Sequence, residues 1–141
     1  MVELMAIWAE FVFAWWILFP AYAANMFPPL ARGKRPLDFG RSMRDGRRIL
    51  GKSKTIEGFA LGVAAGTAIG ALETFFRPPL EAYANSWGFS LPPMSLFIGF
   101  MIALGSMAGD SLGSFAKRRL GMESGADAPF LDQLNFIAGA I

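Results

Sequence analysis

The sequence predicts an all-α fold, a polytopic integral membrane helical bundle, from three observations. Hydrophobic residues make up 54% of the 141 residues and charged residues only 17%, compared with roughly 45–50% and about 25% in a typical soluble protein. The apolar residues gather in runs of about 20, the length that crosses a bilayer as a helix. Lysine and arginine gather between those runs, as they do in loops beside a membrane.

Cysteine and histidine are both absent from the sequence. Disulfides, thiolate metal sites and cysteine nucleophiles are therefore excluded, and so are histidine bases and imidazole ligands of zinc. Any chemistry must use carboxylates, lysine, arginine and hydroxyl groups.

The first predicted span covers residues 4–27, a stretch that is apolar except at Glu10, Pro20 and Asn25. No lysine or arginine precedes Arg32, whereas a cleaved secretory signal begins with a positively charged segment. We therefore expect this helix to remain in the mature protein.

Two more spans are predicted at residues 56–76 and 91–109. A fourth apolar stretch begins at about residue 130, but the sequence ends at Ile141, too soon for a span. Either this stretch is a short re-entrant piece or the C-terminal helices are truncated, which is the interpretation that we favour. The loop of residues 77–90 is bracketed by four prolines, which are expected to fix its turns: Pro78, Pro79, Pro92 and Pro93.

The basic residues predict how the spans are oriented. Residues 32–54, which we name the basic loop, hold nine of the 13 lysines and arginines, and residues 117–119 hold three. The loop of residues 77–90 has Arg77 alone. Because positive charge accumulates on the cytoplasmic side, the N-terminus is expected outside. The basic loop and the segment 110–130 are then the two functional cytoplasmic loops.

The composition of the basic loop suggests a ligand. The loop has a net charge of +7 and four glycines. Glycine lets backbone amides approach a ligand, and arginine and lysine complement phosphate oxygens, so a polyphosphate is the expected partner. The alternative is a polybasic loop that contacts anionic lipid headgroups. Asp38 and Asp45 favour the polyphosphate, because a lipid-attracting patch has no need of acids.

Asp110 ends an uncharged span, where an ionisable residue is a functional candidate. If the helix continues, Ser114, Lys117 and Arg118 share the face of Asp110. That set suits a divalent ion bridging to phosphates, and the alternative is a helix end that reaches the headgroups. Asp132 is expected at the same membrane depth, where it either shares Mg²⁺ with Asp110 or caps the following helix.

Other polar and small residues have structural interpretations. Glu73 and Arg77 are spaced for an ion pair. Asn25 either reaches a cytoplasmic ligand or caps a helix end. A row of glycines, four residues apart, is expected to pack closely on another helix, with a groove for a lipid chain as the alternative: Gly58, Gly62, Gly66 and Gly70.

Two pairs of motifs carry a family resemblance. GDSLGSFAKRRLG at residues 109–121, followed by PFLDQLNF at 129–136, resembles the signature of the CDP-diacylglycerol synthases, which are membrane cytidylyltransferases. PAYAANMFPPL at 20–30 and GKRPLDFGRSMRDGRRILGKSKTIEGF at 33–59 resemble their archaeal branch, the CDP-archaeol synthases. The resemblance covers essentially the whole chain. It departs from the bacterial signature at Asn135, where that signature has its last aspartate.

The resemblance implies a reaction: transfer of CMP from CTP to 2,3-bis-O-(geranylgeranyl)-sn-glycerol 1-phosphate, giving CDP-archaeol and pyrophosphate for archaeal membrane lipids. Together with the orientation predicted from the basic residues, it leads us to expect a multi-pass protein of the cell membrane with its active site towards the cytoplasm. Because a lipid phosphate is ionised near neutral pH, it needs no histidine or cysteine for its attack. CTP, the ether-lipid phosphate and the membrane are the expected partners, and nucleic acid is not.

The resemblance also implies site residues. Mg²⁺ would be held by Asp110 and Asp132, with Ser114 beside the nucleotide, and Lys117 or Arg118 would stabilise the departing pyrophosphate. Asp38 is assigned to the amino group of cytosine. The β- and γ-phosphates are assigned to three residues of the basic loop: Arg47, Arg48 and Lys54.

Two other functions remain as alternatives. A CDP-alcohol phosphotransferase also uses Asp-Gly and Arg in a membrane site, but the string of aspartates that it requires is not found after Asp45. A non-catalytic membrane bundle with an anionic-lipid-binding loop would explain the glycines and the basic loop. It would not explain carboxylates among cations at the bilayer boundary, where Asp110 and Asp132 are expected.

Overall fold

The computed structural model describes the backbone of residues 2–123 and 129–141 and the side chains of 4–123 and 134–141. Four α-helices follow one another, with a 3-10 turn, η1, after the first: α1 (Val2–Met26), η1 (Pro28–Ala31), α2 (Ile56–Ser86), α3 (Leu96–Arg119) and α4 (Pro129–Ala140). Within the described ranges the only β-structure is two isolated bridges. The predicted all-α fold is therefore confirmed, and α1, α2 and α3 are each long and apolar enough to cross a membrane.

Side-chain caps set where α2 and α3 begin. The Thr55 hydroxyl accepts a hydrogen bond from the Gly58 backbone N–H, and the Ser95 hydroxyl accepts one from that of Ile98. Each cap satisfies an N–H group that the first turn of a helix leaves unpaired. The cap at Thr55 also fixes the junction at which the basic loop enters α2.

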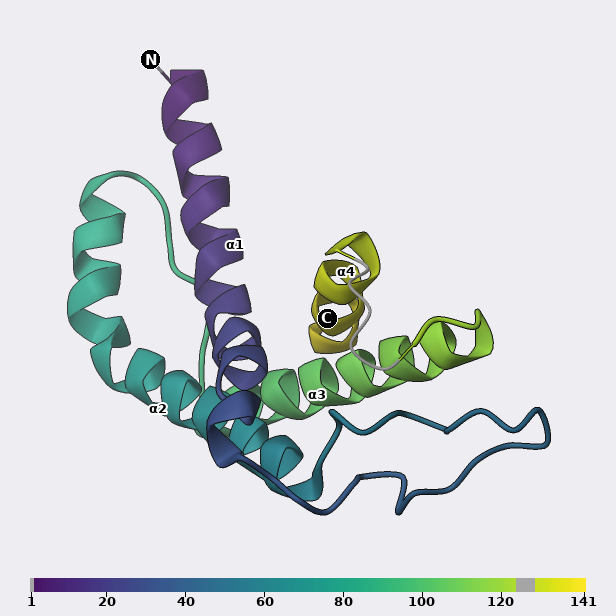
Figure 1. Ribbon diagram of the computed structural model, residues 1–141. Helices are drawn as coiled ribbons and strands as arrows, with labels where there is room; N and C mark the ends of the chain where they lie inside the picture. The colour runs from purple at the N-terminus through teal and green to yellow at the C-terminus, as the bar shows by residue number, and fades with distance from the viewer. Residues whose placement is uncertain (1, 124–128) are drawn as a thin grey trace.

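The far end of α2 corrects two predictions. The helix continues through Pro78 and Pro79 to Ser86, changing direction along its course (Figure 1), because prolines that remove two backbone donors bend a helix that neighbouring contacts support. The predicted Glu73–Arg77 pair is wrong, since Arg77 donates to Glu81 instead at 3.0 Å. Both partners are spaced i, i+4 from Arg77, but Glu73 is buried among apolar residues that face α1.

The glycine row forms a close-packed face, as predicted. A Cβ atom on Gly66 would lie 2.6 Å from the Ala103 Cβ of α3 and 2.6 Å from the Pro20 carbonyl oxygen of α1. A Cβ atom on Gly70 would lie 2.5 Å from the Gly99 Cα atom of α3. Only residues without side chains permit this approach, so these glycines bring α1, α2 and α3 together and do not line a lipid groove.

The fourth helix packs across α3 at equally short range (Figure 1). A Cβ atom on Gly105 of α3 would lie 2.0 Å from the Gly139 carbonyl oxygen of α4. Phe136 of α4 is buried, and its ring centroid lies 5.3 Å from that of Tyr22 on α1. The C-terminal half of α3, which carries Asp110, is thus held by α4 as well as by α2.

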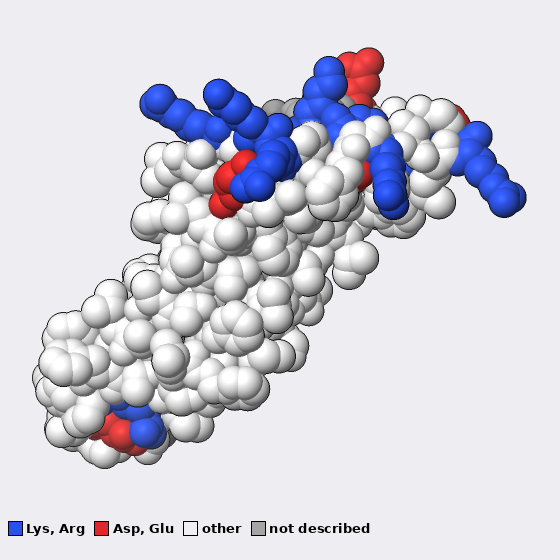
Figure 2. Space-filling model, turned by 90° about the horizontal axis from the view of Figure 1, so that it is seen from below, with Lys and Arg blue, Asp and Glu red and all other residues white. Residues whose placement is uncertain are grey.

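Charge is distributed unevenly over the surface. Figure 2 shows lysine and arginine side chains gathered at one end, a broad uncharged surface, and one small charged group at the far end. The basic loop runs beside the C-terminal half of α3 (Figure 1), and hydrogen bonds join the two. The structure therefore brings the basic loop together with the start of the segment 110–130, as expected for two segments on one side of the membrane. That this side is the cytoplasmic one stays a prediction.

Candidate active site

The basic loop is folded around the carboxylate of Asp38, which is fully buried. One carboxylate oxygen accepts hydrogen bonds from the Gly40 N–H and the Arg48 guanidinium, and the other accepts from the N–H groups of Leu50 and Gly51. Each oxygen thus has two donors. The predicted contact between Asp38 and cytosine is not supported by this geometry, because the carboxylate is enclosed by the loop itself.

These contacts control the pKa of Asp38. Burial by itself would raise the pKa, but the hydrogen bonds from Arg48 and from the backbone of Leu50, Gly51 and Gly40 outweigh it and lower the pKa from 3.8 to about 2. A depressed pKa means that the ionised carboxylate stabilises the folded loop at pH values above about 4. This contribution is lost as the pH falls towards 2.

We therefore expect Asp38→Asn to destabilise the protein at pH 5 by about 2 kcal/mol, the free energy that corresponds to this pKa shift. The difference from wild type should shrink as the pH is lowered to 2, because the wild-type carboxylate is then protonated. Thermal unfolding of the detergent-solubilised protein between pH 5 and pH 2 measures both effects. A parallel loss of stability in the two proteins would contradict the assigned role of Asp38.

A second set of contacts fastens the basic loop to the end of α3. Arg119 donates to the Asp45 carboxylate at 2.7 Å and to the Arg48 carbonyl oxygen at 2.8 Å. In the other direction, Arg47 donates to the Arg119 carbonyl oxygen at 3.1 Å. The backbone N–H of Arg47 and the Arg119 side chain lower the pKa of Asp45. We name Asp45, Arg47 and Arg119 the loop clamp; the acids among the loop arginines were its only signal in the sequence.

A cleft of about 430 Å³ opens where the basic loop meets the helices. Asn25 from α1, Phe59 from α2, and Met107 and Asp110 from α3 form its walls, and residues 52–55 of the loop close one side. Its lining combines apolar surface with polar groups, as expected for a site that takes a substrate with both characters.

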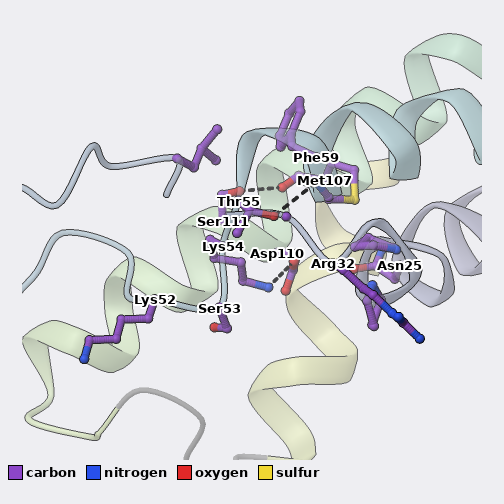
Figure 3. Close-up of a pocket in the computed structure, with 15 residues that line it drawn as sticks. Asn25, Arg32, Lys52, Ser53, Lys54, Thr55, Phe59, Met107, Asp110 and Ser111 are labelled. Carbon is purple, nitrogen blue, oxygen red and sulfur yellow. Dashed lines mark hydrogen bonds and ion pairs between the residues drawn. The ribbon is translucent and has the colours of Figure 1, made fainter. Parts of the chain in front are cut away.

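The ion pair between Lys54 and Asp110 lies within this cleft (Figure 3). Both side chains are mostly buried, with 24% of Lys54 and 19% of Asp110 exposed. The helical spacing predicted that Lys117 and Arg118 share the face of Asp110 on the same helix, and it gave no sign of a cation from another segment. Lys54 is instead brought in from the basic loop, because the Thr55 cap places the preceding residue beside α3.

Asn25 connects the cleft to the interior of the bundle. Its side-chain amide donates to the Ala21 carbonyl oxygen at 3.1 Å and to the Ser106 hydroxyl of α3. Ser106 is fully buried and donates to the same Ala21 oxygen at 3.3 Å. This polar link joins α1 to α3 one turn from Asp110. Both possibilities considered for Asn25, ligand contact and capping of a helix end, stay open at this position.

A second, basic cavity of about 270 Å³ adjoins the cleft, with Lys52 lining both. Arg47, Arg48 and Arg118 supply its other cationic side chains. Arg118 is buried, as are Ser114 and Lys117, and the Arg118 Nε has no hydrogen-bond partner among the described residues. The structure thus gathers most of the predicted phosphate contacts in two neighbouring spaces.

The donor set around Asp110 fits a magnesium ion bound largely through its substrate. The described residues contain no group of three acidic side chains that would form a metal cage. Mg²⁺, however, usually keeps several waters and takes one or two carboxylates together with substrate phosphates. Asp132 belongs to α4, but its side chain lies outside the described residues, so its predicted role as a second ligand stays a prediction.

Comparison with known proteins agrees with this arrangement. The chain matches the family model described as CarS-like CDP-archaeol synthase over residues 5–141. The CDP-archaeol synthase of Methanopyrus kandleri is 45% identical over 134 residues, which cover 95% of this chain and 70% of the relative. That of Thermococcus onnurineus is 43% identical over 133 residues, covering 94% and 74%.

A solved structure is similar as well. It is of an intramembrane enzyme for the biosynthesis of archaeal membrane lipids, with 46% sequence identity and a TM-score of 0.74, and the match covers 90% of this chain and 72% of that one. Sequence and fold therefore lead to the same assignment. The chain belongs to the CDP-archaeol synthases, the intramembrane cytidylyltransferases that form CDP-archaeol in archaeal lipid synthesis.

Proposed function

We propose that the chain transfers CMP from CTP to 2,3-bis-O-(geranylgeranyl)-sn-glycerol 1-phosphate with the help of Mg²⁺, in the cleft that holds Lys54 and Asp110 and on the cytoplasmic side of the membrane. The observation that carries the proposal is the carboxylate of Asp110, which α3, a helix long enough to span a membrane, places in a cleft beside a cavity lined by arginines. A carboxylate binds a metal ion, and the cations bind phosphates.

The chemistry requires charge neutralisation more than proton transfer. A phosphate oxygen of the lipid attacks the α-phosphorus of CTP, forming a new P–O bond. The bond from the α-phosphorus to the bridging oxygen of the β-phosphate breaks, and that oxygen leaves with pyrophosphate. Both reactants are anionic, so the protein must hold them close together and compensate the charge of the leaving group.

The residues divide this task by position. Asp110 would hold Mg²⁺, which when bound neutralises phosphate charge as a Lewis acid. The adjoining cavity, with Arg118 as its main contact, would receive the pyrophosphate part of CTP. Arg47 also fastens the loop to α3, and Arg48 is paired with Asp38, so we assign these two a smaller share of the phosphate contacts than the sequence suggested.

The lipid substrate must reach the same cleft while its chains remain in the membrane. The packed glycine row offers no opening between α2 and its neighbours. The cleft itself has an apolar wall that includes Pro28, Phe59 and Met107. We therefore place the isoprenoid chains against this wall, with the phosphate directed towards Asp110.

The nucleotide assignment predicts selective stabilisation by CTP. In the presence of Mg²⁺, CTP should raise the thermal unfolding temperature of the detergent-solubilised protein, because a ligand at 100 times its Kd stabilises the folded state by about 2.7 kcal/mol. ATP at the same concentration should give a much smaller shift. Equal shifts with CTP and ATP would refute cytidine selectivity, and release of pyrophosphate on addition of the lipid phosphate tests the reaction directly.

A further inference from the structure

Lys54 forms an ion pair with Asp110, the carboxylate that would bind Mg²⁺ in the proposed reaction. Its ammonium group pairs with Asp110 Oδ2 inside the cleft, where Figure 3 shows the side chain extended from the loop towards α3. The backbone at Lys54 is held independently of this pair. Its carbonyl oxygen accepts a hydrogen bond from the Leu37 N–H at 2.8 Å, and the next residue, Thr55, caps α2.

A fixed backbone with a long side chain allows the ammonium group to move while the loop stays in place. About a quarter of the Lys54 side chain is exposed to the cleft, so the space needed for this movement is already open. The carboxylate of Asp110 lies near the apolar surface of Met107 and Phe59, where an unpaired charge is unfavourable. A resident cation therefore stabilises Asp110 when no metal ion is bound.

A divalent cation and an ammonium group compete for the same carboxylate because like charges repel at such short range. We propose that Lys54 is an exchangeable counter-ion: Mg²⁺ displaces it from Asp110, and the released ammonium group then binds a phosphate of the incoming nucleotide. This inference rests on the proposed function. It assigns Lys54 a positioning role that alternates between the carboxylate and the substrate.

The exchange couples the two ligands. Mg²⁺ alone must displace Lys54 without offering it a new partner, so the metal ion binds weakly to the empty protein. When a nucleotide phosphate is present, the displaced lysine has an anion to bind. Each ligand therefore strengthens the binding of the other, and thermodynamic linkage requires the effect to be reciprocal.

The reactivity of the Lys54 amine reports the exchange directly. An amine-acylating reagent, with the product quantified by mass spectrometry, should label Lys54 slowly in the metal-free protein, faster with Mg²⁺, and slowly again with Mg²⁺ and CTP together. Lys34 is exposed and does not line the cleft, so it serves as the internal reference. In the Asp110→Asn variant, the reagent should label Lys54 rapidly whether or not Mg²⁺ is added.

Calorimetry of Lys54→Met gives a second readout that is independent of activity. The variant should bind Mg²⁺ alone roughly tenfold more tightly than wild type, because one competing charge-assisted hydrogen bond is removed. It should bind CTP at saturating Mg²⁺ roughly tenfold more weakly, because one such contact to phosphate is lost. Lys34→Met removes the same charge from the same loop and should change neither affinity appreciably.

The outcomes separate this inference from the function on which it rests. If Mg²⁺ binds wild type and not Asp110→Asn, yet leaves the labelling of Lys54 unchanged, the exchange is refuted and the metal site stands. If Mg²⁺ affinity is the same in wild type and Asp110→Asn, the metal site and the exchange both fail. Equal effects of Lys54→Met and Lys34→Met would reduce the role of Lys54 to a general electrostatic one.

Discussion

Asp110→Asn is expected to lower the turnover of cytidylyl transfer by a factor on the order of a thousand or more, since a catalytic metal ion supplies several kcal/mol of transition-state stabilisation. Asparagine keeps the shape of the side chain and removes its charge, so a Mg²⁺ ion would lose its carboxylate ligand. Turnover of the purified variant in detergent, with saturating CTP and lipid phosphate, measures the loss.

Glu81→Gln is the matched control for this prediction, because it also removes one carboxylate. The cleft lies at the N-terminal end of α2, whereas Glu81 pairs with Arg77 near the C-terminal end of that helix. The turnover of Glu81→Gln should remain close to that of wild type. Asp110→Asn should also remain folded, since the uncharged asparagine needs no counter-ion and the released Lys54 ammonium group can be hydrated from the cleft. Near-normal turnover of Asp110→Asn with Mg²⁺ would exclude Asp110 as the metal ligand.

Gly66→Leu is expected to produce the largest loss of stability. The first atom of the new side chain would already lie 2.6 Å from both Ala103 Cβ and the Pro20 carbonyl oxygen. Neither neighbour can turn away, because one is a backbone atom and the other is bound directly to the backbone. The three helices must then separate, which costs more than the usual ~1–3 kcal/mol for overpacking.

Ala64→Leu, which places the same side chain on the exposed face of α2 one half-turn earlier, is the control for Gly66→Leu. Thermal unfolding in detergent should distinguish the two variants by a large decrease for Gly66→Leu alone. A stable Gly66→Leu protein that binds CTP normally would show that the helices at this position can adapt, and would reopen the lipid-groove interpretation of the glycine row.

The features that sequence patterns predicted well depend on local composition. Long, mostly apolar runs predicted the three long helices, and a four-residue glycine spacing predicted their packed face. Asp110, at the end of an uncharged stretch, was recognisable as a functional position because a charge there has no role in crossing a bilayer. In each case the physical cause, burial in lipid or close helix contact, acts on residues near one another in the chain.

The features that were missed are ion pairs and hydrogen bonds whose partners are decided by tertiary packing. Spacing alone allows Arg77 to pair with Glu73 or with Glu81, and only the packing of α1 decides between them. Helical periodicity likewise relates Asp110 only to residues further along α3, whereas its ion-pair partner, Lys54, comes from the basic loop. The carboxylate of Asp38 was assigned to a ligand because the sequence does not reveal that four donors of its own loop surround it.

The ordering of the basic loop around Asp38 has a thermodynamic consequence for binding. Fixing a flexible residue costs roughly 1–2 kcal/mol of conformational entropy, and a loop that became ordered only around its nucleotide would subtract that cost from the affinity. Here the turn is built by Arg48 and backbone N–H groups of the loop itself, before any phosphate arrives. The interaction energy between the cations and the triphosphate is then available for tight binding and for alignment of the reacting atoms.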